Sequence, residues 1–247
     1  MNPYTQYQGS GYPAGVGASG IDFGAIMRQV YLWLAGGLAI CFGVAYVLGN
    51  LAINSPNSAA AALIFNPVAI IVALIAYLGL GFGFYPIVRR ASPAVGAALF
   101  IIFAVVFGFL ISSVFIVYTP ASIATAFVTT AAMFGIMSII GFTTKLDLSK
   151  LGALFLTALI GLIIGSVVNI FVHSSILYWV ITYLGVIIFT GLIAFDTQWI
   201  KKNALSVAGS GDTASVSRVA LIGAFRLLLD FVNLFLYLLR IFGGGRN

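Results

Sequence analysis

Long apolar runs fill the chain from residue 29 to residue 242, and short polar connections separate them. Seven runs each reach or approach the ~20 residues that an α-helix needs to cross a bilayer. They cover residues 29–49, 66–88, 94–117, 121–142, 151–172, 176–200 and 219–242. The pattern therefore predicts an all-α, polytopic membrane bundle of seven transmembrane helices, which forms one domain over residues 25–247.

The remaining segments are predicted to be irregular. Residues 1–20 carry no charge and are rich in Gly, Tyr, Ser, Gln and Pro, a composition typical of disorder. We therefore assign residues 1–24 to a disordered N-terminal tail. The uncharged, partly apolar residues 50–65 are predicted to lie at the membrane interface, and residues 203–217 to form a flexible Gly/Ser loop.

Composition agrees with a membrane protein. Hydrophobic residues make up 62% of the chain and charged residues 6%, whereas about a quarter of the residues in a soluble domain are charged. The net charge of +6 comes from cations at the ends of apolar runs, not from a basic face, so we expect the lipid bilayer as a partner and no nucleic acid. No HExxH, CxxC, Walker or GxSxG pattern is present, and we expect no cofactor.

Cations alternate along the connections and predict the orientation. Eight of them belong to the N-terminal flank and every second connection: Arg28, Arg89, Arg90, Lys145, Lys150, Lys201, Lys202 and Arg218. The intervening connections carry none, which by the positive-inside rule places the N-terminus in the cytoplasm, with the plasma (inner) membrane as the expected location. Arg240 and Arg246 run against a full crossing by the last run, which leaves a re-entrant segment open.

Polar residues form one stripe in the last apolar run. Arg226, Asp230, Asn233, Tyr237 and Arg240 follow spacings of four, three, four and three, and so share one face of an α-helix. Ionisable groups at membrane depth are costly and usually face the protein interior. The last helix is therefore predicted to turn this stripe inward, with Asp230 aimed at Asp196 near the end of the preceding run.

Several blocks resemble the Bax inhibitor family, also called the transmembrane Bax inhibitor motif family. They are VYLWLAGGLAICFGVAYV, the long block from FIVYTPASIATAF to GLIIGSVVNIF, IAFDTQWIKK, and LDFVNLFLYLLRIFG. The resemblance covers about residues 25–243 in order, and the set of blocks is specific although no single block is diagnostic. It implies a seven-helix bundle with the last helix central, and a cation leak pathway, mainly for Ca²⁺, that is gated by pH.

The resemblance also implies roles for individual residues. It implies that Asp196 and Asp230 form a proton-sharing pair that senses pH, lies on the ion pathway and contacts Ca²⁺ transiently. It implies an arginine latch at the cytoplasmic end of the second helix, which by position is Arg90, with Arg89 as the neighbouring candidate. Both arginines could instead serve only as topology charges. Ca²⁺ is then the transported ion and the proton the gating ligand.

Elementary electrostatics agrees with such a pair. Two carboxylates ~4 Å apart repel by ~4 kcal/mol at an effective dielectric constant of ~20, so the pair would hold one proton and titrate as a unit. Carboxylate oxygens are also the ligands that Ca²⁺ prefers. The alternative is structural: Asp196 and Asp230 would pair with Arg226 or with the backbone only to satisfy one another.

Two features of this sequence differ from what the family pattern implies. The predicted spans place Asp196 and Asp230 at depths that differ by ~10 Å if both helices begin at one level. The family usually has a small or neutral polar residue where Arg226 stands, one turn before Asp230. We expect Arg226 to pair directly with Asp230, and Asn233 either to line the pathway or to be structural.

Two other functions remain open. Intramembrane aspartyl proteases also use two aspartates on adjacent membrane helices, but their second motif is GxGD and Asp230 follows RLLL; we therefore expect no enzymatic activity. The stronger alternative is a non-conducting membrane regulator. Family members are linked to suppression of cell death, and some bacterial relatives to a membrane quality-control protease, so other membrane proteins are candidate partners.

Overall fold

The computed structural model describes residues 22–243, so most of the predicted tail lies outside the described residues. The elements in chain order are α1 (Phe23–Asn54), α2 (Ala59–Ile64), α3 (Pro67–Val88), α4 (Pro93–Leu110), η1 (Ile111–Ser113), α5 (Val114–Val117), α6 (Pro120–Thr143), η2 (Leu148–Leu151), α7 (Gly152–Val172), α8 (Ser175–Val207) and α9 (Thr213–Phe242). Within the described part, seven spans are long and apolar enough to cross a membrane, α4 to α5 counting as one. The predicted all-α bundle of seven transmembrane helices is confirmed.

Helix starts follow from local capping chemistry. Proline occupies the first position of α3, α4 and α6, where its missing N–H costs nothing. The preceding side chains, Asn66, Ser92 and Thr119, each accept a hydrogen bond from a backbone N–H of the first turn. These cap-and-proline pairs fix where three of the spans begin.

The loop predicted for residues 203–217 is mostly helical, and the prediction was wrong there. Helix α8 continues to Val207 and α9 begins at Thr213, capped by the side chain of Asp212. The physical reason is packing: Ala204 and Val216 are both buried in the main hydrophobic core, so each polar-looking segment is held by an apolar side chain. In residues 50–65, predicted to be interfacial, the short helix α2 forms.

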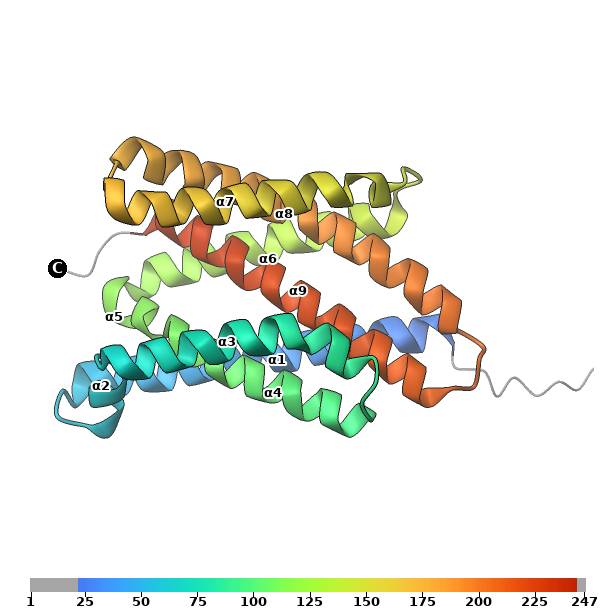
Figure 1. The fold of residues 1–247 in the computed structure, drawn as a ribbon, viewed down its shortest axis with the longest axis horizontal. Helices are drawn as coiled ribbons and strands as arrows, with labels where there is room; N and C mark the ends of the chain where they lie inside the picture. The colour runs from blue at the N-terminus through green and yellow to red at the C-terminus, as the bar shows by residue number, and fades with distance from the viewer. Residues whose placement is uncertain (1–21, 244–247) are drawn as a thin grey trace, which may run out of the picture.

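Helix α9 is the most buried span. In its most apolar 18-residue window 72% of the residues are buried, against 6% for α3 and for α7. It packs on α1, α3, α4, α6 and α8, and Figure 1 shows it running between a group formed by α6, α7 and α8 and a group formed by α1, α3 and α4. Its 30 residues form an unbroken helix ~45 Å long, with no re-entrant turn.

Two contacts hold the segment of α8 that carries Asp196. Gly141 of α6 lies against the backbone of Ala194, where an added Cβ would come within 2.8 Å of the Ala194 Cα. On the other side, the Gln198 side chain accepts from the Leu148 N–H (2.8 Å) and donates to the Leu146 carbonyl (2.7 Å). Asp196 is therefore placed by α6 and by the α6–α7 connection.

We predict that Gly141→Ala destabilises the bundle by about 1–3 kcal/mol, because a methyl group cannot enter this contact without moving α8. Gly135→Ala on the same helix is the matched control, since nothing lies within 4 Å of its added Cβ. Thermal unfolding of the two purified variants measures the difference. Equal unfolding temperatures would show that the α6–α8 contact is not tight.

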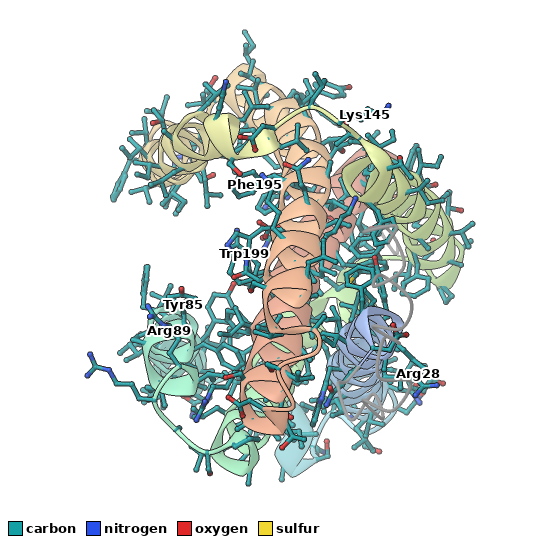
Figure 2. All side chains as sticks on the ribbon, turned by 90° about the vertical axis from the view of Figure 1, so that its right-hand side faces the viewer. Arg28, Tyr85, Arg89, Lys145, Phe195 and Trp199 are labelled. Carbon is teal, nitrogen blue, oxygen red and sulfur yellow. The ribbon has the colours of Figure 1, made fainter. Side chains whose placement is uncertain are left out.

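The eight cations that predicted the orientation, the first of which is Arg28 and the last Arg218, lie at one end of the bundle. We call this the cation-rich end, and Figure 2 looks onto it. The connections at the opposite end contain none of the described Lys or Arg residues. Ser55 and Ser210 are exposed at opposite ends, and Cys41 is buried.

We predict that a cysteine at Ser210 reacts with an impermeant thiol reagent only from the cytoplasm, and a cysteine at Ser55 only from the other side. Labelling of both positions from one side in intact cells would contradict the orientation derived from the cations.

Candidate functional site

Two buried carboxyl groups meet inside the bundle. Asp196 of α8 is 5% exposed and Asp230 of α9 is 4% exposed, and their side chains lie within hydrogen-bonding reach of each other. Helix α8 ends about two turns later and α9 begins about two turns earlier than predicted, which leaves the expected difference in depth nearly unchanged. The two carboxyl groups nevertheless meet, so the assumption that both helices begin at one level was wrong. The structure thus brings together the two aspartates that the sequence singled out.

Arg226 forms its ion pair with Asp196, not with Asp230, and the predicted partner was wrong. Its guanidinium lies 4.6 Å from the ring centroid of Trp199 and 5.7 Å from that of Phe195, both on α8. These rings flank Asp196 and direct the arginine across to α8 instead of along its own helix. Figure 2 labels both rings; the sequence reasoning missed them, although aromatic residues one before and three after Asp196 were a readable signal.

Asp230 takes part in neither of the ion pairs found among residues 22–243. Its Oδ2 atom is buried without a hydrogen-bond partner, and the Nε atom of Arg226 is likewise buried and unpaired. Two ionised carboxylates and one guanidinium would leave a net charge of −1 in an apolar bundle, which is costly. One proton held between Asp196 and Asp230 makes the cluster neutral, so this geometry suits the sharing of a single proton.

The cluster borders an open cavity. A cleft of about 700 Å³ lies between α3 and α7, with α8 and α9 at its base; we call it the lateral cleft. Asp196, Arg226 and Asp230 line it, and Asn233 and Tyr237 continue the lining along α9. Side chains such as Leu78, Phe82, Leu159 and Ile163 form the apolar walls. Figure 2 shows the opening between α7 and the α3 segment that carries Tyr85 and Arg89.

The structure does not bring the predicted latch arginines to the aspartates. Arg89 and Arg90 are exposed at the end of α3, and the Arg89 guanidinium lies 5.5 Å from the centroid of the Tyr85 ring. Neither takes part in the ion pairs found among the described residues. The cation at the pair is therefore Arg226, from α9 itself.

Sequence comparison places the chain. The family described as "Inhibitor of apoptosis-promoting Bax1" matches residues 24–247, and the chain belongs to this Bax inhibitor family of membrane proteins. The inner membrane protein YbhL of Escherichia coli K12 is 43% identical over 221 residues, which cover 89% of this chain and 92% of YbhL.

Two further relatives come from other bacteria. An uncharacterized protein of Deinococcus radiodurans is 41% identical and covers 90% of both chains. An uncharacterized membrane protein of Streptococcus pyogenes is 33% identical over 91% of this chain and 95% of its own length. The similarity thus extends over nearly the full length of each relative, as it must if the whole bundle is shared.

Proposed function

We propose that the protein is a pH-sensitive cation leak channel, with Ca²⁺ as the transported ion and with Asp196 and Asp230 on its pathway. The observation that carries the proposal is the pair of adjacent carboxyl groups, buried at membrane depth and open to the lateral cleft. A merely structural ion pair would need one carboxylate for Arg226, and here there are two.

The described residues contain no group of three or more His, Cys, Asp or Glu side chains that could hold a metal. Ca²⁺ usually takes six to eight oxygen ligands, and two carboxylates supply only part of such a shell. An ion at this site would keep much of its water and would leave readily. This arrangement suits transient contact during passage.

The proton acts on the charge of the cluster. With one proton shared, the three groups are neutral, and uptake of a second proton frees Arg226 from its carboxylate partner. Among the described residues, the charged group beside the pair is Arg226, which lies on α9 with Asp230 and pairs with Asp196 of α8. Acid would therefore release α8 from α9 at this level, and pH would bias the equilibrium between a closed and an open bundle.

We predict that the double variant Asp196→Asn/Asp230→Asn removes the pH dependence of Ca²⁺ flux into liposomes that contain the purified protein, because no carboxylate remains at the site to take up a proton. Flux is followed with an enclosed Ca²⁺ indicator over a pH series. Asp147→Asn is the matched control: Asp147 lies in the α6–α7 connection and pairs with Lys202 at 2.5 Å, away from the cleft. A folded parent protein without flux at any pH would contradict the channel and favour the non-conducting regulator.

Arg226 is proposed to be the latch of this chain. It holds Asp196 within the membrane span, whereas Arg89 and Arg90 lie outside the site. A cation beside the pair opposes the second protonation, so Arg226 sets the pH at which the cluster responds.

We predict that Arg226→Ser shifts the midpoint of the flux–pH curve upward by on the order of one pH unit, equivalent to ~1.4 kcal/mol. Arg226→Lys keeps the charge and should shift it less. Arg28→Gln, which removes an exposed cation at the cation-rich end and away from the pair, is the control. Because loss of one partner from a buried ion pair can cost ~3–5 kcal/mol of stability, each variant is first shown to be folded. Overlapping curves for a folded Arg226→Ser variant and the parent would exclude this role.

A further inference from the structure

Arg240 lies apart from the other described cations. It is in the last turn of α9, at the end opposite the cation-rich end. Its guanidinium is 5.0 Å from the centroid of the Tyr237 ring and 5.6 Å from that of Tyr178. The ion pairs within the described part of the chain involve other residues, and the arginine hydrogen bonds there are made by Arg218 and Arg226.

Stacking and the helix dipole satisfy Arg240 only in part. The C-terminal end of a helix favours a cation, and two aromatic rings add to this. A guanidinium nevertheless has five N–H donors, and neither ring offers it an in-plane acceptor. At the level where a membrane helix ends, the abundant acceptor with matching geometry is the phosphate of a lipid headgroup.

The lateral cleft ends next to this arginine. Tyr237, one turn before Arg240, lines the cleft, and Arg226 and Asp196 line it at its other end. From residue 226 to residue 237 the helix rises ~16 Å, so the cleft is long and narrow. Its walls are apolar side chains of the two least buried spans, α3 and α7, which face the membrane.

The dimensions of the cleft favour a lipid chain as its occupant. The cleft encloses about 700 Å³ and extends along at least ~16 Å of α9. Water is disfavoured along the apolar walls. A single acyl chain matches the narrow shape and the apolar lining.

We propose that one anionic phospholipid binds here, with its phosphate at Arg240 and one acyl chain in the lateral cleft. The positive charge of Arg240 selects against a headgroup that carries its own ammonium group, because no carboxylate among the described residues lies beside Arg240 to balance it. The bound chain covers the Asp196–Asp230 pair on its membrane side. This binding site does not depend on the protein being a channel.

The test is native mass spectrometry of the purified full-length protein in detergent, titrated separately with phosphatidylglycerol and with phosphatidylcholine. The parent is expected to retain one phosphatidylglycerol and to bind phosphatidylcholine at least roughly tenfold more weakly. Arg240→Gln should weaken phosphatidylglycerol binding by roughly tenfold, and Arg240→Lys by less. If Arg240→Gln does not fold, the role of Arg240 is tested by comparing the binding of phosphatidylglycerol and phosphatidylcholine to the parent and to Arg240→Lys.

A second pair of variants tests the acyl chain. Gly81 lines the lateral cleft and has room for a side chain, with only Phe103 Cε2 at 4.0 Å from an added Cβ. Gly79, two residues earlier on α3, has nothing within 4 Å and does not line the cleft. Gly81→Leu should weaken phosphatidylglycerol binding by roughly tenfold, and Gly79→Leu should leave it unchanged.

Three results would overturn the proposal. Equal binding of the two lipids would show that the positive charge of Arg240 does not select an anionic headgroup. Displacement of the lipid by inorganic phosphate at millimolar concentration, together with no effect of Gly81→Leu, would show a site for free phosphate. A stoichiometric protein partner in the spectra of the parent, with no lipid retained, would show that the cleft takes a helix.

Discussion

A charge at membrane depth needs a partner, and this requirement organises the bundle around Asp196, Asp230 and Arg226. The three groups lie on two adjacent helices, α8 and α9, which share the most extensive helix contact in the structure. Burial of α9 on five other helices excludes lipid from most of its surface, and the cluster uses the remaining open side. If α8 moved away from α9, Arg226 and Asp196 would separate in an apolar environment, at a cost of several kcal/mol.

The same requirement explains why small residues and polar clamps surround the site. Gly141 lets α6 approach the backbone of α8 two residues before Asp196, and Gln198 ties α8 to the α6–α7 connection two residues after it. Together they fix the height and rotation of the carboxyl group. The aromatic rings of Phe195 and Trp199 then hold the guanidinium against α8. We propose that pH acts on this fixed geometry, because a second proton neutralises the carboxylate with which Arg226 forms its ion pair.

Much of the fold could be predicted from hydropathy, since a span needs about 20 apolar residues and every such run became a helical span, although a 3-10 turn interrupts the run 94–117. Spacings of three and four correctly placed the polar stripe on one face of α9, because they are a property of the helix alone. The prediction that this face turns inward was wrong: it borders the lateral cleft and is the least buried side of α9, with Arg226, Asn233 and Arg240 only half-buried. The ends of α8 and α9 could not be predicted, since buried Ala204 and Val216 stabilise a segment whose composition is typical of a loop. The partner of Arg226 was missed because a sequence shows neighbours along one helix, whereas the rings that direct this side chain belong to another. The lateral cleft depends on the separation of α3 from α7, which no local pattern encodes.

The central claim is that the cluster holds one proton at neutral pH. Infrared spectroscopy of the protein in lipid measures it directly, because a protonated carboxyl group inside a protein absorbs apart from ionised carboxylates. We expect a protonated carboxyl band at neutral pH in the parent, and its loss in Asp196→Asn and in Asp230→Asn, since the single remaining carboxylate then pairs with Arg226. Absence of the band from the parent at neutral pH, or its persistence in both variants, would show that Asp196 and Asp230 do not share one proton.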